Sequence, residues 1–476
     1  MSKIEVNKVG PQCGTTVTVG CGAGQTVVVD ANTVTLGRCG GTVALASGAS
    51  QTGFGRTGTV NWDTTIKTGD FTATSGSGFF VNTSGGSNIT VTLPASPSAG
   101  DIVSVADYAG TAATNKIIIA RNGSNIEGAA ANSALTDNRA AVTLIFADST
   151  QGWIPVNDNA DSSLDPAFVT ATGGNVISTC GNFKTHIFTA PGTFCVSCAG
   201  NTVGSNTVDY FVLAGGGGGG NDGFGAPRVG GGAGGGGFRV SNSVGCVPAP
   251  SMSPLANPTG LPVAASPYPV TVGGGGSAGG PALGNDSGNR GSNSVFAGSS
   301  TITSTGGGGG QGHAPASGGP ATNTPGGSGG GVQDTVPNPS NNGEGNTPPV
   351  SPSQGNPAGS GGNAPQYAGG GGGGAGAAGS NQSGSTGGSG GVGGIISTDF
   401  IGPSAPAYGT TGPAAGRYFA GGGGSSPGGA GGSGGGGGGS GSPAGPANTG
   451  GGGGGHRGSN AGTGASGIVM IRYKFQ

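Results

Sequence analysis

The sequence predicts an all-β protein whose C-terminal half is a bundle of extended glycine strands. Of its 119 glycines, 91 follow residue 214, whereas ordinary usage is roughly 7% glycine. These glycines form uninterrupted blocks, and strand-like apolar runs at 207–214 and 468–475 bracket them. No segment carries the i, i+3, i+4 apolar stripe of an amphipathic helix. We therefore expect a winding N-terminal β segment, β-sandwich-like domains and a polyglycine bundle closed by β-strands.

Residues 1–58 are predicted to form an N-terminal β attachment segment. Valines alternate with other residues in short runs, as at Val17 and Val19 or Val27 and Val29, and glycine, asparagine and serine separate the runs. Strands this short cannot each bury a face alone. The pattern suits a winding fold in which three chains share one apolar axis, and a small monomeric β solenoid is the alternative.

Residues 59–160 are predicted to form a β-sandwich or small barrel. Alternating apolar residues at 89–93 and 142–146 favour half-buried antiparallel strands. Turn-forming sequences such as Arg121-Asn122-Gly123 separate the strands. The expected strands are 71–74, 79–82, 88–93, 101–106, 116–120, 141–147 and 152–156. Residues 161–214 are predicted to be a smaller β domain that ends in the strand 207–214.

Residues 215–476 are predicted to be a bundle of polyproline-II-type helices. That geometry makes no internal hydrogen bonds, so each buried backbone N–H and C=O needs a partner on a neighbouring strand. Strands approach closely enough only without a Cβ atom, as at the axis of collagen. A six-residue block spans roughly 19 Å at about 3.1 Å per residue. The alternative is disorder, but the segment holds only 12 charged residues.

The two bracketing runs are predicted to pair antiparallel and close the glycine region. With a strand period of two, Val469, Ile471 and Tyr473 share one face with Phe475, and Arg472 and Lys474 fall on the other. Asp209 is placed opposite Arg472. Ordering so much glycine costs heavy backbone entropy, so we also expect stabilising contacts within a trimer.

Composition argues against several kinds of partner. The net charge is −2 with 7% charged residues, and the sequence has no basic stripe of the kind that binds nucleic acid. No apolar run reaches the roughly 18 residues of a membrane span. Neither a cofactor nor a metal site is expected. Cys195 and Cys198 form a lone CxxC pair, interpreted as two thiols on a strand or turn, with a redox pair or half a zinc site as the alternative.

Three stretches resemble tail-fibre proteins of tailed bacteriophages, especially those of marine hosts. The opening Ser-Lys-Ile-Glu-Val-Asn-Lys-Val-Gly-Pro-Gln-Cys-Gly-Thr, residues 2–15, resembles the start of such fibres. Residues 92–103 and 119–128 resemble a β domain found along fibre shafts. The run Asp-Tyr-Phe-Val-Leu-Ala followed by six glycines, residues 209–220, resembles the distal glycine-rich domain, together with the closing residues 464–473.

The resemblance implies a structural and adhesive virion protein, made in the host cytoplasm and without catalytic activity. It implies a homotrimer whose N-terminus binds other tail or baseplate proteins and whose distal loops bind a host cell-surface glycan or protein. Two alternatives remain. A glycine-rich ice-binding or matrix protein would need a flat face of regularly spaced threonine or alanine. A capsule-degrading enzyme would need paired carboxylates, yet the glycine region holds five scattered acidic residues.

Inserts between the glycine blocks supply the candidate binding residues. Aromatic faces can stack on sugar rings, and loops held by a rigid scaffold are where binding residues concentrate. The alternative is that these aromatic side chains pack at the edges of subunits or of the strand bundle. The candidate receptor-binding residues are Tyr367, Phe400, Tyr408, Tyr418, Phe419 and His313.

Overall fold

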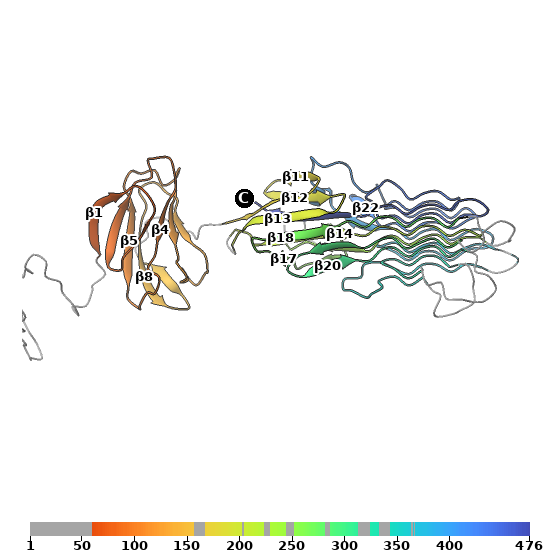
Figure 1. Cartoon of the computed structure of the whole chain (residues 1–476), viewed down its shortest axis with the longest axis horizontal. Helices are drawn as coiled ribbons and strands as arrows, with labels where there is room; N and C mark the ends of the chain where they lie inside the picture. The colour runs from red at the N-terminus through yellow and green to blue at the C-terminus, as the bar shows by residue number, and fades with distance from the viewer. Residues whose placement is uncertain are drawn as a thin grey trace, which may run out of the picture. The chain divides into compact units, whose positions relative to one another are not determined.

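The computed structural model describes two bodies of the chain, and their regular secondary structure is almost entirely β-strand (Figure 1). The first body is residues 60–156. The second covers residues 167–476 without 202–203, 223–228, 244–251, 281–285, 313–323, 333–342, 363–364 and 366. The predicted attachment segment 1–58 lies outside the described residues. The all-β class is confirmed, and α2 (Thr398–Ile401) is a single helical turn.

The first body is a sandwich of two sheets. Five strands form one sheet in the order β1-β3-β5-β8-β9, and four form the other in the order β2-β4-β6-β7. The strands are β1 (Asn61–Lys67), β2 (Phe71–Thr72), β3 (Ser77–Val81), β4 (Ile89–Thr92), β5 (Ile102–Asp107), β6 (Ile117–Ala120), β7 (Ser133–Leu135), β8 (Ala141–Asp148) and β9 (Gly152–Pro155). The sequence analysis missed β1 and β7.

Strands β1 to β6 alternate between the two sheets, and this alternation decides their direction. Neighbours within a sheet are therefore two strands apart in sequence, and β1, β3 and β5 pair in parallel, as do β2, β4 and β6. The antiparallel expectation was wrong for the strand around residues 89–93, which is β4. It was right for β8, which lies antiparallel between β5 and β9. A strand that is buried on one face alternates apolar and polar residues in parallel and antiparallel sheets alike. The sequence pattern therefore could not distinguish the two kinds of sheet.

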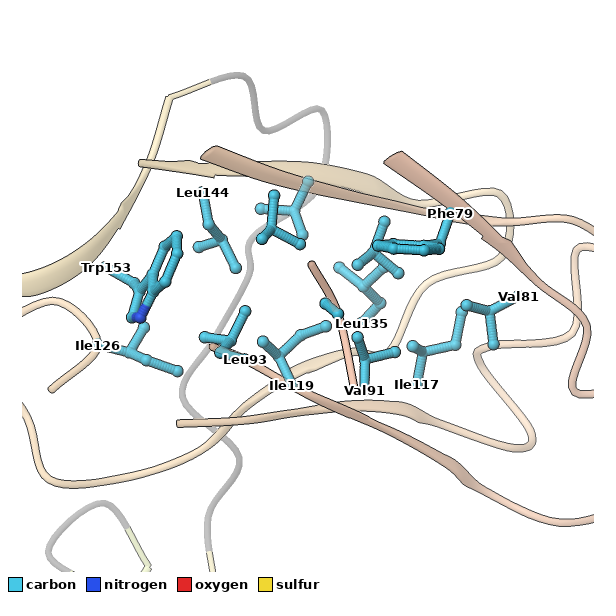
Figure 2. Close-up of a cluster of buried hydrophobic side chains, with 14 of the residues drawn as sticks. Phe79, Val81, Val91, Leu93, Ile117, Ile119, Ile126, Leu135, Leu144 and Trp153 are labelled. Carbon is cyan, nitrogen blue, oxygen red and sulfur yellow. The ribbon is translucent and has the colours of Figure 1, made fainter. Parts of the chain in front are cut away.

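Hydrophobic side chains fill the space between these two sheets (Figure 2). Val91, Ile119 and Trp153 are completely buried, and the rings of Phe146 and Trp153 meet edge to face at 5.6 Å. Fully burying an aliphatic or aromatic side chain contributes about 1.5–3 kcal/mol. The first body is thus stabilised by an ordinary apolar core.

The second body also contains two large sheets. The first has the order β11-β12-β23-β14-β15-β16, with β17 also paired to β14, and the second has the order β10-β13-β18-β19-β20. Their strands are β10 (Val169–Thr172), β11 (Val176–Cys180), β12 (Phe183–Phe188), β13 (Gly192–Ala199), β14 (Thr207–Leu213), β15 (Phe238–Ser241), β16 (Ala256–Asn257), β17 (Leu261–Pro262), β18 (Pro267–Thr271), β19 (Ser294–Ala297), β20 (Thr301–Ser304) and β23 (Ile468–Lys474). A separate hairpin pairs β21 (Gly394–Ile396) with β22 (Arg417–Phe419).

The C-terminal strand β23 lies between β12 and β14 and pairs antiparallel with both. The predicted closure of the glycine region by its two bracketing strands is therefore confirmed, and Asp209 lies opposite Arg472 in the register. Val469, Ile471 and Tyr473 enter one buried cluster, as expected from the strand period. Both large sheets of the second body combine strands that precede residue 214 with strands that follow it.

The glycine segments form a bundle of extended strands (Figure 1), and backbone hydrogen bonds link neighbouring strands. Residues 215–221 run through its centre, and every third N–H donates to the same neighbour: Gly215 and Gly218 both donate to the strand 286–292. The N–H groups reach three antiparallel neighbours, residues 286–292, 462–465 and 231–234. The C=O groups accept from three parallel ones, residues 276–279, 307–310 and 453–456.

This threefold repeat is the period of a polyproline-II helix, and it gives the central strand six neighbours. A side chain on this strand has no space. A Cβ atom added to Gly216 would lie 2.0 Å from the carbonyl oxygen of Gly451, and one added to Gly219 would lie 2.1 Å from that of Gly454. Real Cβ atoms essentially never approach another heavy atom within 3.0 Å. The glycine blocks are therefore required by backbone packing.

Among the described residues, no helix is both long enough and apolar enough to cross a membrane.

Candidate functional site

The bundle strands run away from the sheets of the second body and reverse direction at their far ends (Figure 1). We call the described turns at these far ends the tip: residues 381–386, 426–430, 440–442 and 456–460. Asn381, Ser383 and Thr386 are exposed in the first of these turns, where Ser383 and Thr386 exchange backbone hydrogen bonds of 3.0 Å. The tip turns thus present small polar groups held by ordered backbone.

The end of the central strand is fastened to the turn 456–460. The carboxylate of Asp222 is buried, accepts a hydrogen bond of 2.9 Å from the N–H of Gly458, and lies 4.0 Å from Nε of Arg457. The side-chain amide of Asn221 donates to the carbonyl oxygen of Ser459. Arg457 itself remains exposed. These contacts hold the guanidinium group of Arg457 at the tip, and they come from the end of the bundle's central strand.

The aromatic insert 395–419 lies at the opposite end of the bundle, against the sheets. Phe400 and Phe419 are completely buried in one apolar cluster, and the Phe419 ring meets Phe211 of β14 edge to face at 5.0 Å. Tyr408 is partly buried against the same cluster, and this burial raises the pKa of its hydroxyl. The insert therefore joins the bundle to the β14 sheet.

Tyr418 and Arg417 hold the loop of this insert in place. The hydroxyl oxygen of Tyr418 accepts a hydrogen bond of 3.0 Å from the N–H of Ala414. The Arg417 guanidinium donates to the carbonyl oxygens of Ala407 and Tyr408, at 2.7 and 2.6 Å. These bonds satisfy the loop's own backbone groups rather than presenting them to a partner.

The structure brings four of the six candidate receptor-binding residues together, but not at the tip. Phe400, Tyr408, Tyr418 and Phe419 lie at the base of the bundle, and three of them are buried. This placement fits the alternative in which the aromatic residues pack at the bundle's edge. Elsewhere, Tyr367 is half-buried, and His313 lies outside the described residues.

The sequence analysis did not single out the polar residues of the tip, although a signal for them existed. Glycine blocks that run outward end in polar residues: Asn221 and Asp222 follow one block, and His456 and Arg457 follow another. In a bundle without side chains, the first polar residue after a block marks the position where the strand leaves the interior. Reading the blocks this way would have located the tip.

Side chains that could take part in catalysis or bind a metal ion are few in the described part of the chain. No group of three or more His, Cys, Asp or Glu residues there could hold a metal ion. Cys195 and Cys198 lie on β13 as exposed free thiols, in agreement with the interpretation of two thiols on a strand. His186 is buried, its Nδ1 lies 2.7 Å from the carbonyl oxygen of Gly173, and burial lowers its pKa.

A comparison with known protein families matches residues 189–474 to a family described as a glycine-rich domain. The match begins within the sheets and ends at the closing strand β23, so it covers the bundle together with most of the strands that bracket it. No curated protein matches the chain.

Proposed function

Because the chain belongs to the glycine-rich domain family, we propose that its bundle is the distal, host-binding part of a bacteriophage tail fibre. The observation that carries this proposal is the separation of tip and base. The aromatic insert is used to anchor the bundle, while the tip turns expose hydroxyl, amide and guanidinium groups. A scaffold held by backbone hydrogen bonds leaves the tip sequence free to vary without loss of a core.

The polar character of the tip favours a glycan or polar protein surface as the receptor. Ser385 and Thr386 are exposed in one turn, and Arg457 and Ser459 are exposed in another. Hydroxyl and amide groups can donate to and accept from sugar hydroxyls. The proposed action is binding without catalysis, and the N-terminal region would join the fibre to other tail or baseplate proteins.

A binding assay on bacterial cells tests this function. Fluorescently labelled full-length protein is incubated with a panel of marine and other bacterial strains, and bound label is measured by flow cytometry. We expect binding to some strains, and loss of that binding in Ser385→Arg, which places a bulky charge in a tip turn. Thr271→Arg, which alters an exposed threonine on β18, is the control. Equal loss in both variants, or binding to no strain, would contradict the proposal.

A homotrimer is part of the same proposal. Analytical ultracentrifugation of the full chain should give three times the chain mass of 44.0 kDa. Electron microscopy of phage particles labelled in the tip turn 381–386 should place the label at the free end of a fibre. A monomer in solution, or label at the tail attachment point, would oppose this arrangement.

Exposed threonines on one sheet support a second candidate, ice binding. The outward face of the β10-β13-β18-β19-β20 sheet carries exposed threonines on four of its five strands, and no charged residue stands at an exposed position of these strands. These threonines are Thr170, Thr172, Thr193, Thr271 and Thr301. Thermal hysteresis of the purified protein in freezing solution would support this candidate, and its absence would remove it.

A further inference from the structure

Strand β13 carries two free thiols that its sequence spacing would normally separate. Cys195 and Cys198 are both exposed. In a regular strand, successive side chains point to opposite faces, so residues three apart lie on opposite sides of the sheet. The exposure of both thiols therefore requires an irregularity in the strand.

A β-bulge supplies this irregularity. Cys195 pairs with Thr172 of β10 and Cys198 pairs with Thr170, so three steps along β13 match two steps along β10. The extra residue is Ser197, whose hydroxyl donates to the carbonyl oxygen of Thr170 at 3.1 Å. A bulge re-aims the side chains beside it, and this one is held against the neighbouring strand by a side-chain hydrogen bond.

The bulge places both thiols on the outward face of the sheet. Thr170 and Thr172 are exposed on that face, whereas Ala171 between them is buried. Directly opposed residues of an antiparallel pair share a face, so the two cysteines share the face of the two threonines. Because those threonines are two residues apart, the Cα atoms of the cysteines are about 7 Å apart, at roughly 3.4 Å per residue.

This separation suits an ion between the sulfur atoms better than a direct bond between them. The Cα atoms of a disulfide usually lie about 4.4–6.8 Å apart, so the cysteines are at the upper end of that range. Two metal–thiolate bonds of about 2.3 Å each span up to roughly 4.6 Å from sulfur to sulfur. Rotation about the Cα–Cβ bonds can bring two thiols on one face to that distance.

The residues around the pair supply no third soft ligand. Thr170 and Thr172 lie opposite the cysteines on β10, and Pro267 of β18 lies opposite Cys195 on the other side. Within the described ranges, no three His, Cys, Asp or Glu side chains come together in a way that could hold a metal ion. Structural zinc sites and iron–sulfur clusters use four protein ligands, so neither fits the pair.

We propose that Cys195 and Cys198 bind one Cu(I) ion through their two sulfur atoms. Thiolate is a soft ligand that selects Cu(I), and this closed-shell ion forms stable complexes with two thiolates in a near-linear arrangement. Each thiol releases its proton when it binds the metal, so the occupied site carries a single negative charge. The threonine hydroxyls on β10 can donate hydrogen bonds toward the sulfur atoms.

This site lies on β13, so it adds to the proposed function without depending on the tip. The Ser385→Arg variant should bind Cu(I) normally, and variants that lose Cu(I) binding should still bind to bacterial cells. The two proposals can therefore fail separately.

Alkylation of the unmodified full chain tests the assignment. Reduced protein is incubated under nitrogen with increasing amounts of Cu(I), added as its acetonitrile complex, and then treated with iodoacetamide. Mass spectrometry measures the alkylation of each cysteine. We expect Cu(I) to slow alkylation of Cys195 and Cys198 together, at least tenfold. Cys180 is a half-buried single thiol on β11, and its rate should not change.

Single substitutions show whether both sulfur atoms are needed. Cu(I) affinity is measured by competition with the chelator bathocuproine disulfonate, in a full-length chain where serine replaces the four cysteines outside the described residues, Cys13, Cys21, Cys39 and Cys246. Cys195→Ser and Cys198→Ser should each lower the affinity at least 100-fold, because one thiolate alone holds the ion poorly. Cys180→Ser is the matched control and should bind normally. Circular dichroism checks that each variant is folded.

Three results would overturn the proposal. Protection of Cys180 equal to that of Cys195 and Cys198 would mean that Cu(I) binds any thiol of the chain. An unchanged affinity in either single variant of the pair would show that the two sulfur atoms do not act together. Zn(II) binding as tight as that of Cu(I) would show a site with further ligands.

Discussion

The sandwich and the glycine bundle have interiors that are stabilised by opposite kinds of contact. In the sandwich, Val91, Ile119 and other apolar side chains exclude water from the space between two sheets (Figure 2). In the bundle, the N–H and C=O groups of residues 215–220 point at six neighbouring strands, and no side chain intervenes. One interior is stabilised mainly by apolar burial, and the other by hydrogen bonds between the backbones of neighbouring strands.

The comparison shows that the two regions are sensitive to opposite kinds of substitution. A sandwich core loses stability when side chains are shortened, because a cavity remains. The bundle loses stability when side chains are lengthened, because a carbonyl oxygen already occupies the place of the first carbon. The bundle also pays a larger conformational cost per residue, since glycine loses the most backbone freedom on folding. It therefore depends on the sheets at its base.

Removal of residues 468–476 should have the largest effect. Strand β23 pairs with both β12 and β14, and its side chains enter two apolar clusters. Without it the sheet is split and the bundle loses its base, so we expect the whole glycine region to become sensitive to protease. Limited proteolysis with mass spectrometry measures this. The sandwich 60–156 should resist digestion as before, and unchanged resistance of the glycine region would show that the bundle stands without its closing strand.

Substitution Gly219→Ala should be the most damaging single change in the bundle. The new methyl group would lie 2.1 Å from the carbonyl oxygen of Gly454, and we expect a loss of about 3 kcal/mol or more in the free energy of unfolding, at the upper end of overpacking effects. Denaturant melts of the full chain measure the change.

Gly274→Ala is the matched control, because a Cβ atom at Gly274 meets nothing within 4 Å. It should be neutral or stabilising by up to about 1 kcal/mol, since alanine restricts the unfolded chain. Equal effects of the two alanines would mean that close backbone packing does not stabilise the bundle.

Substitution Ile119→Ala tests the opposite rule in the sandwich. Ile119 is completely buried in the core, so its truncation should cost about 2–5 kcal/mol. Amide hydrogen exchange should speed up within 60–156 and stay slow at Gly215–Gly220. Fast exchange at those glycines in the unmodified protein would contradict a hydrogen-bonded interior.

The smallest expected effect is a pH dependence in the second body. Burial lowers the pKa of His186 below its usual 6.5, so the unfolded chain takes up a proton at a pH where the folded chain does not. This stability is present above about pH 6.5 and is lost as the pH falls below that value. Thermal melts between pH 7.5 and 5 should show a falling melting temperature, and His186→Gln should weaken the dependence.

The buried hydroxyl of Tyr473 should cause a second loss of folding stability, at alkaline pH. Burial raises its pKa from 10.0 to about 12, and its hydroxyl lies 3.1 Å from Nε2 of His186. Stability from this group is complete below about pH 10 and is lost between pH 10 and 12. Tyr473→Phe should flatten the dependence of the melting temperature on pH in that range. A dependence unchanged in both variants would assign the pH effects to other groups.

Local pattern alone determined several features of this protein. A glycine block has one physical use in an ordered chain, close backbone approach, so the bundle could be predicted from composition. Period two along residues 468–475 fixed the two faces of β23, and the pairing of Asp209 with Arg472 followed from the antiparallel register. These features depend on neighbours in sequence or on a single strand pair.

The tertiary structure alone decided the direction of strands β1 to β6 and the place of the aromatic insert. Burial of alternate residues is identical in parallel and antiparallel strands, so only the path of the chain between two sheets made β4 parallel to its neighbours. Phe400 and Phe419 looked like exposed loop residues because their distant partner Phe211 is invisible in local sequence.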